Sequence, residues 1–318
     1  MWCKGSSILI SFVVIAVSGS FCLAACPSAD LTGDCFVDFN DFALIAIDWP
    51  VTDFDDVAVM ANQWLTGDSC DPCIPDGMVG VYIDDPGVPG HDGFTGYMSK
   101  YETTNAQYCE FLNDALASGD IYVSADTVYG SNGSNGGADF VDEIYFDTFA
   151  AHDGSQITYS GVTFSVRTRD DYDMSDHPVV MVSWYGATAF CNYYGYRLPT
   201  EWEWQAVADF DGSYIYGCGT TINQNKANYY DGGYANPLGL SGNPYTSPVD
   251  YYSSYGYGMN DITGNVYEWT DSWWSDNHYF RVLRGGSWRS VAYSSTVSHR
   301  YTYYPYSRYA YVGFRVCR

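Results

Sequence analysis

Beyond Phe210 the sequence loses the hydrophobic periodicity of helices and strands and becomes rich in glycine, asparagine and tyrosine. A loop-rich region of this kind needs support other than repetitive backbone hydrogen bonds, and bound calcium and disulfides are the expected supports. Within it, RVLRGGSW (Arg281 to Trp288) carries the paired glycines Gly285 and Gly286. Glycine lets a backbone approach another group closely because it has no side chain. This stretch is therefore the first candidate for a functional site.

Length and charge narrow the classes of protein that the chain can belong to. It has 318 residues, of which 47% are hydrophobic, enough for one large domain or for a small domain and a larger one. Its formal net charge is -25, with 13 Lys and Arg against 38 Asp and Glu. So acidic a chain disfavours nucleic acid as a partner.

Residues 1–25 have the layout of a secretory signal peptide, with an early lysine, an apolar run and small residues before Cys26. Leu23 to Cys26 also matches the lipobox of bacterial lipoproteins, in which Cys26 carries the lipid. Removal of Cys3 and Cys22 with the signal leaves eight of ten cysteines, an even number that suits disulfides. We therefore expect secretion, extracellular or periplasmic, with lipid anchoring at Cys26 as the alternative. No later segment is apolar for long enough to span a membrane.

Residues 26–68 resemble a dockerin, a calcium-dependent module that binds a cohesin. Six residues fall at the ligand positions of a calcium loop: Asp30, Thr32, Asp34, Phe36 through its carbonyl, Asp38 and Asp41. Cys35 stands where glycine usually makes the turn. The helix pattern DFALIAIDW that follows is echoed by DVAVMANQW. The resemblance implies a small all-α calcium module and a cohesin-type partner, and the alternative is an acidic arm with two amphipathic helices.

Residues 69–93 are rich in Pro, Gly and Asp and are predicted to form a linker. The main domain is predicted to cover residues 94–318. Within it, residues 119–176 are interpreted as an insertion that contains a hairpin turning at Ser160-Gly161. Val179 to Val182 is predicted to form a short buried strand.

Three helices are expected in the main domain. Capping boxes begin at Thr104 and Thr200, and Ser183 can cap a helix that ends at Gly195. The apolar residues that follow these caps recur at helical spacing, which usually indicates core packing rather than chemistry. Trp184, Phe190 and Trp204 are therefore expected in the core.

Five motifs of the main domain together resemble one protein family. They are HPVVMVSW (His177 to Trp184), YRLPTEWEW (Tyr196 to Trp204), GMNDITGNVYEW (Gly258 to Trp269), RVLRGGSW, and GFRVCR (Gly313 to Arg318). From about Tyr97 to Arg318 the chain resembles the formylglycine-generating enzymes, also called the sulfatase-modifying-factor family. The resemblance implies an α+β, C-type-lectin-like fold with much irregular structure, and a disulfide between Cys191 and Cys317.

Asp261 and Glu268 are two carboxylates with a glycine turn between them that exposes carbonyls. Calcium prefers this oxygen-rich arrangement, although a solvated acidic turn would have the same sequence. The resemblance implies a structural calcium held by the side chains of Asp261 and Glu268 and the carbonyls of Gly264 and Val266. It also implies a second calcium at Asn228, the Tyr229 carbonyl, Asn243 and the Tyr245 carbonyl. The spacing between the two halves of this second set departs from the family pattern.

The family's oxidases hold Cu(I) with two cysteine thiolates, and oxygen then oxidises a substrate cysteine to formylglycine. The matching positions, two and seven residues after Trp288, are Ser290 and Ser295. A serine hydroxyl is hard and far less acidic than a thiol, so it cannot replace a copper thiolate. Copper is therefore not expected. The five histidines show no close metal-ligand spacing, and no phosphate loop or nucleophile elbow is present.

The segment from Ser290 to Tyr311 has seven tyrosines and five serines in 22 residues. Tyrosine supplies large, rigid contacts at little cost in entropy, and serine supplies adaptable hydrogen bonds. The segment also resembles the variable region of diversity-generating-retroelement target proteins. The expected ligand-binding residues are Arg289, Tyr293, Arg300, Tyr301, Tyr303, Tyr304, Tyr306 and Arg308. The alternative is that these tyrosines pack a loop-rich core.

These observations predict a secreted protein that has lost oxidase activity and that binds an extracellular ligand or partner through Arg281 to Tyr311. The alternative is a sulfatase-maturing oxidase with a different set of copper ligands.

Overall fold

The computed structural model describes residues 75, 77–88, 91–131 and 140–318. They belong to one compact unit, Cys73–Arg318. The predicted signal peptide, Cys26 and the dockerin-like module with its six calcium ligands lie outside the described residues. Within the described part, no helix has the length and apolar character needed to cross a membrane.

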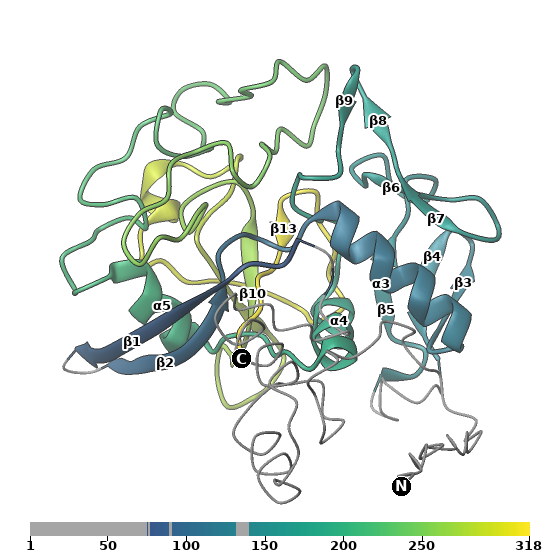
Figure 1. The fold of residues 1–318 in the computed structure, drawn as a ribbon, viewed down its shortest axis with the longest axis horizontal. Helices are drawn as coiled ribbons and strands as arrows, with labels where there is room; N and C mark the ends of the chain where they lie inside the picture. The colour runs from purple at the N-terminus through teal and green to yellow at the C-terminus, as the bar shows by residue number, and fades with distance from the viewer. Residues whose placement is uncertain (1–74, 76, 89–90, 132–139) are drawn as a thin grey trace, which may run out of the picture. The chain divides into compact units, whose positions relative to one another are not determined.

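A hairpin of β1 (Gly80–Val88) and β2 (His91–Ser99) opens the described chain. Ile83, Phe94 and Met98 are buried in one cluster with Trp204, and Figure 1 shows the hairpin beside α5. The prediction of a linker over residues 69–93 was therefore wrong from Gly80 onward. The Pro and Gly residues that indicated a linker lie near the turn end of an edge strand, where strands tolerate both.

The three helices begin at the predicted caps: α3 (Asn105–Ser118) at Thr104, α4 (Trp184–Tyr194) at Ser183 and α5 (Glu201–Asp209) at Thr200. Both capping boxes are complete. In each, the side chain of the cap residue accepts a hydrogen bond from the backbone N–H of the third helical residue, whose own side chain accepts one from the backbone N–H of the cap residue. Helix α4 ends at Gly195 in the left-handed conformation, with φ 73. The helix predictions are confirmed.

The predicted insertion is folded into small antiparallel sheets. One sheet contains β3 (Ile121–Ser124), β4 (Thr127–Gly130) and β5 (Ile144–Asp147). The predicted hairpin is formed by β6 (Ile157–Tyr159) and β7 (Phe164–Val166), and a shorter one by β8 (Thr168–Arg169) and β9 (Tyr172–Asp173). Val179 to Val182 is buried but is not a strand, because Met181 has φ 63 and interrupts extended pairing.

The central sheet has the order β12-β11-β10-β13. Its strands are β10 (Tyr267–Trp273), β11 (Arg281–Arg284), β12 (Tyr301–Tyr303) and β13 (Val312–Gly313). Strand β13 runs parallel to β10, whereas the other pairs are antiparallel. A short 3-10 helix, η2 (Ala292–Ser295), lies in the connection between β11 and β12. Much of the chain between α5 and β10 is irregular, and the observed class is α+β, as predicted (Figure 1).

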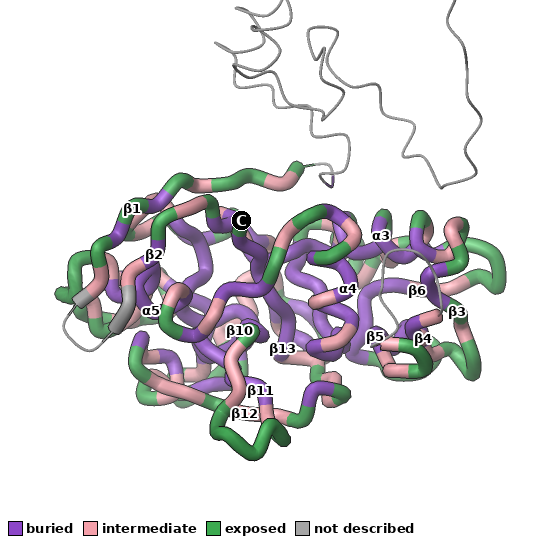
Figure 2. The backbone as a smooth tube through the Cα atoms, turned by 90° about the horizontal axis from the view of Figure 1, so that it is seen from below, coloured by how far each residue is buried: buried purple, intermediate pink, exposed green. Residues whose placement is uncertain are grey.

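The main core lies between α3, α4 and the central sheet (Figure 2). Tyr108, Phe190 and Phe314 form a buried aromatic cluster, with ring centroids 5.3–6.1 Å apart. Trp184, Phe190 and Trp204 are buried as predicted. Because Phe314 follows β13, this packing fixes the C-terminal strand that borders the candidate site.

Candidate functional site around the Gly285-Gly286 turn

The paired glycines after β11 make the close approach that the sequence predicted. Gly285 and Gly286 have φ 92 and 79, a conformation that favours glycine. A Cβ at Gly286 would overlap the side chain of Ser295, and one at Gly285 would lie 3.2 Å from the Trp204 ring. Any larger residue would push η2 and α5 away from the turn.

Ser290 and Ser295 both lie against this turn. The Ser290 hydroxyl accepts from the Ser287 backbone N–H at 3.1 Å and lies 3.1 Å from the Ser287 hydroxyl. Ser295, at the end of η2, is buried against Gly286 and donates to the Val291 carbonyl at 3.4 Å. Ser295 thus meets Gly286 and Ser290 bonds to the residue that follows the turn, and both present hydroxyl groups only.

The predicted calcium residues Asp261 and Glu268 lie in the interior with Glu102 and Arg315. Arg315 forms two hydrogen bonds of 2.7 Å with the Glu268 carboxylate, and Trp204 Nε1 donates to it at 2.7 Å. By contrast, both carboxylate oxygens of Asp261 are buried without a hydrogen-bond partner. Three carboxylates around one guanidinium leave this cluster short of positive charge.

The electrostatics of the cluster agree with that deficit. Burial raises the pKa of Glu102 well above its usual value, and the charges of Asp261 and Glu268 add to the effect. Burial also raises the pKa of Asp261, with a further contribution from Glu268 against the opposing effect of Arg315. A cation bound at Asp261 would reverse both effects.

The donor set fits a calcium ion. No three Asp, Glu, His or Cys side chains in the described part of the chain can hold a metal by themselves, so backbone carbonyls such as those of Gly264 and Val266 would have to contribute. Glu102 fixes this turn, because it accepts from the Val266 N–H at 3.0 Å and from Asn265 Nδ2 at 2.7 Å. Each ionised carboxylate oxygen of Glu268 can accept more than one contact.

The second predicted calcium set is only partly brought together. Asn228 is buried and its Nδ2 donates to the Tyr245 carbonyl at 2.7 Å, while its Oδ1 has no hydrogen-bond partner. The Tyr229 carbonyl accepts from Gln224 at 3.0 Å. Asn243 is exposed. The second site therefore stays a prediction.

Most tyrosines of the predicted binding segment are exposed. Five of the seven have exposed side chains: Tyr293, Tyr301, Tyr304, Tyr306 and Tyr309. Tyr303 and Tyr311 are half-buried, and their hydroxyls lie 2.7 Å apart. Trp288 and Phe314, at the two ends, are 3% and 0% exposed. The alternative that this segment packs a core does not hold for the five exposed rings.

The arginines of the segment are held in place by other side chains. Arg300 forms two hydrogen bonds with Glu201, at 2.5 and 2.7 Å, and Arg308 pairs with Asp147 at 2.7 Å. The Arg289 guanidinium lies 5.4 Å from the centroid of the Tyr311 ring. The surface is therefore preorganised, with two of its three cations already paired.

The family model that describes a sulfatase-modifying factor enzyme 1-like domain matches residues 92–318. The chain belongs to this family. Its match begins in β2 and covers every motif from which the sequence analysis drew the resemblance. The family fold is therefore established for the region that contains the Gly285-Gly286 turn.

Three relatives show how the family match is distributed. The formylglycine-generating enzyme of Mus musculus is 29% identical over 76% of this chain and 73% of its own length. Inactive C-alpha-formylglycine-generating enzyme 2 of Bos taurus is 38% identical over 39% of this chain and 42% of its own. Serine/threonine-protein kinase pkn1 of Chlamydia caviae is 34% identical over 45% of this chain. The match spans only 24% of that kinase.

Among solved structures, Treponema denticola variable protein 1 is similar to this chain. The sequence identity is 20% and the TM-score 0.48, over 76% of this chain and 94% of that one.

The family resemblance also predicted a disulfide between Cys191 and Cys317, and the structure shows two free thiols there. Both are buried. Burial raises the pKa of Cys317 to about 12, and burial together with the charge of Cys317 raises that of Cys191. The thiols are thus neighbours but are not bonded in this structure.

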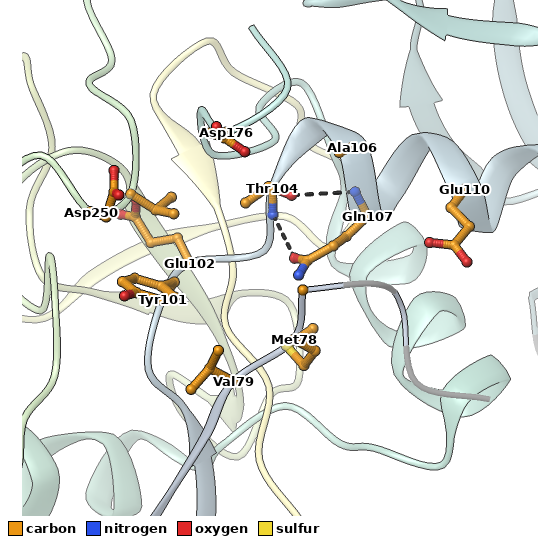
Figure 3. A pocket seen from close by; sticks show the side chains of 12 residues that line it. Met78, Val79, Tyr101, Glu102, Thr104, Ala106, Gln107, Glu110, Asp176 and Asp250 are labelled. Atoms are coloured by element: carbon orange, nitrogen blue, oxygen red, sulfur yellow. Dashed lines mark hydrogen bonds between the residues drawn. The ribbon is translucent and has the colours of Figure 1, made fainter. Parts of the chain in front are cut away.

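A cavity of about 490 Å³ lies beside the start of α3 (Figure 3). Its charged lining consists of Glu102, Glu110, Asp176 and Asp250, without lysine or arginine. Figure 3 shows Glu102 and Asp250 at the same end of the cavity. Because Asp250 also acts on the pKa of Asp261, the cavity adjoins the buried carboxylate cluster.

The sequence did not predict that Glu102 belongs to the buried carboxylate cluster with Asp261 and Glu268. Glu102 precedes the Thr104 capping box and is far from Asp261 in sequence, so no local spacing connects them. A glutamate placed directly before a buried helix start was the only local signal, and the structure shows it to be 1% exposed.

Proposed function

We propose that this chain is an exported member of the sulfatase-modifying-factor family that lacks formylglycine oxidase activity and binds an extracellular ligand or partner. The observation that carries the first part is the chemistry of the Gly285-Gly286 turn. Ser290 and Ser295 present hydroxyls there, and the four cysteines of the described residues are Cys109, Cys191, Cys218 and Cys317. Soft Cu(I) needs thiolates, and hydroxyls do not supply them. A relative whose name describes it as inactive supports the same conclusion.

The experiment is an aldehyde assay with copper, oxygen and a Cys-x-Pro-x-Arg peptide. We expect no formylglycine above a control without enzyme. The matched variant is Ser290→Cys with Ser295→Cys, which places thiols at the two positions where the family's oxidases carry cysteines. Turnover by the unmodified chain would refute the proposal.

The alternative function is a sulfatase-maturing oxidase that uses a different ligand set. The similarity to the mouse formylglycine-generating enzyme over most of both chains favours it. The same assay decides, because only this alternative predicts aldehyde from the unmodified protein.

The binding function is supported by the five exposed tyrosines between Ser290 and Tyr311. Two of them, Tyr301 and Tyr309, are linked through the half-buried Tyr303, whose ring lies 5.2 Å from Tyr301 and 4.3 Å from Tyr309. Tyrosine and arginine dominate binding hot spots because each buries much area while keeping a polar tip. We include calcium at Asp261, Gly264, Val266 and Glu268 as the structural support of this surface, because three carboxylates of that cluster share the single guanidinium of Arg315.

Export, and a cohesin-type partner for the dockerin-like module, form part of the proposal on sequence grounds alone. Both concern residues 1–68, which lie outside the described residues. Calcium-dependent binding of the isolated full chain to a cohesin is the direct test of the second.

A further inference from the structure

A set of exposed aromatic rings includes two tyrosines of the predicted segment and extends beyond it. The exposed members are Trp202, Trp274, Tyr279, Tyr304 and Tyr306, at 36%, 42%, 62%, 42% and 50% of their full exposure, and we call them the aromatic patch. They come from α5, from the β10–β11 connection and from the segment after β12. Exposed apolar patches on soluble proteins usually mark interaction sites.

A series of contacts connects four of these five residues, Trp202, Trp274, Tyr304 and Tyr306. The Arg300 guanidinium lies over both Trp274 and Trp202, 4.3 and 5.9 Å from the ring centroids. The backbone N–H of Trp274 donates to the Phe280 carbonyl, and the centroid of the Phe280 ring lies 4.5 Å from that of Tyr304. Tyr304 then stacks on Tyr306, with centroids 5.2 Å apart and planes 7° apart.

The fold already uses one contact repeatedly in this region, a guanidinium group on an aromatic ring. Arg281 lies between Trp184 and Trp273, 3.7 and 3.6 Å from their centroids. Arg300 makes the same kind of contact with Trp274 at the edge of the patch. Cations within about 6 Å of a ring are attracted by its quadrupole, and arginine makes this contact more often than lysine. The exposed rings therefore offer faces suited to further guanidinium groups.

The charge around the patch favours a cationic occupant. Its arginines are neutralised internally, Arg281 by Asp271 at 3.0 Å and Arg300 by Glu201 at 2.5 Å. Asp276 adds an exposed carboxylate in the β10–β11 connection. The whole chain carries a formal charge of -25, which repels anionic lipids and nucleic acids and attracts basic proteins.

We propose that the aromatic patch binds an arginine-rich segment of a partner protein, whose guanidinium groups stack on Trp274, Tyr304 and Tyr306. This inference rests on the proposed binding function and deepens it by naming the partner's chemistry. It also extends the binding surface to Trp202, Trp274 and Tyr279, which the sequence analysis did not include.

The test is fluorescence anisotropy with the full chain and a short, labelled, cysteine-free peptide of alternating arginine and glycine. The double variant Trp274→Ala with Tyr304→Ala should weaken binding roughly five- to thirtyfold, the combined effect of two exposed cation–π contacts. The matched control is Tyr82→Ala with Tyr97→Ala, which removes an exposed ring pair from the β1–β2 hairpin. The control variant should bind as the unmodified chain does, and all three proteins should have similar melting temperatures.

A lysine-glycine peptide of equal charge separates stacking from simple attraction. It should bind the unmodified chain more weakly than the arginine peptide, and the difference should shrink in the double variant. Equal loss of binding in both variants, or no preference for arginine, overturns the inference and leaves only the net charge. Binding of a neutral soluble glucan that depends on Trp274 and Tyr304, without peptide binding, assigns the patch to carbohydrate and also overturns it. None of these failures by itself decides the result of the aldehyde assay. The proposed loss of oxidase activity is therefore tested separately.

Discussion

Substitution of Asp261 by asparagine should abolish the response to calcium of the main domain's melting transition without weakening the calcium-free fold of that domain. Both Asp261 oxygens are buried without a hydrogen-bond partner, in a cluster where three carboxylates share Arg315. Removing the negative charge ends the cost of its burial and its repulsion from Glu268, which together outweigh the lost attraction to Arg315 because the pKa of Asp261 is raised overall. Asparagine also tolerates the left-handed backbone that Asp261 adopts, with φ 55. The calcium-free variant should therefore melt at or slightly above the temperature of the calcium-free unmodified chain.

The size of the calcium response follows from mass action. A ligand present at about 100 times its dissociation constant stabilises the fold by about 2.7 kcal/mol. For a domain of this size, about 1 kcal/mol shifts the melting temperature by roughly 2–4 °C. Calcium should thus raise the melting temperature of the unmodified chain by roughly 5–11 °C and leave that of Asp261→Asn nearly unchanged.

The assay is differential scanning fluorimetry in calcium and in chelator. Asp250→Asn is the matched control, because Asp250 is exposed, acts on Asp261 and is not a predicted ligand. Glu268→Ala is the wrong variant, since it would remove the buried ion pair with Arg315 and both of its hydrogen bonds, a loss of about 3–5 kcal/mol with or without calcium. An unmodified chain whose melting temperature ignores chelator, or an Asp261→Asn variant that still responds to calcium, would refute the reasoning.

Three further predictions follow from single contacts. Cys191 and Cys317 are free in this structure, but under oxidising conditions they should form a disulfide that closes a long loop at a gain of roughly 4 kcal/mol on the chain-entropy model. Non-reducing peptide mapping of the oxidised protein checks this, and a free thiol at either position contradicts it. Burial lowers the pKa of His177 to about 4. Because the unfolded chain binds this proton near pH 6.5, stability should fall as the pH falls through the window from about 6.5 to 4, by up to about 3 kcal/mol. Replacing His177 by glutamine should flatten that part of the melting curve against pH. Substituting Tyr301 and Tyr309 together by alanine should change stability by no more than about 1 kcal/mol, which thermal melting checks.

Features encoded by neighbouring residues could be predicted from the sequence. The capping boxes at Thr104 and Thr200 and the Ser160-Gly161 hairpin depend on residues a few positions apart, and all three occur. The requirement for glycine at the Gly285-Gly286 turn could also be predicted, because the two glycines are adjacent in the sequence. Strand β1 was missed because its pairing with β2 is set by burial of Ile83 against distant side chains rather than by its own composition.

Contacts between distant residues could not be predicted from one sequence. Glu102 belongs to the buried carboxylate cluster because the start of α3 lies beside that cluster. Arg315 reaches Glu268 because β13 pairs in parallel with β10. Likewise, Trp274 joins the tyrosine segment only through the folded β10–β11 connection and Arg300. Sequence spacing identified the carboxylates and the tyrosines, whereas their partners became visible only in three dimensions.

The Gly285-Gly286 turn separates what the fold requires from what copper chemistry requires. Gly285 and Gly286 leave no room for a larger residue, since side chains there would meet Trp204 and Ser295. Ser290 and Ser295 are under different constraints, because a hydroxyl fills almost the same space as a thiol and forms hydrogen bonds here: Ser290 accepts from the Ser287 N–H, and Ser295 donates to the Val291 carbonyl. A chain can therefore exchange both thiols for hydroxyls and keep the turn intact. On this argument, the retained turn is evidence for the family fold alone, and the aldehyde assay on the chain with Ser290 and Ser295 in place decides the oxidase question.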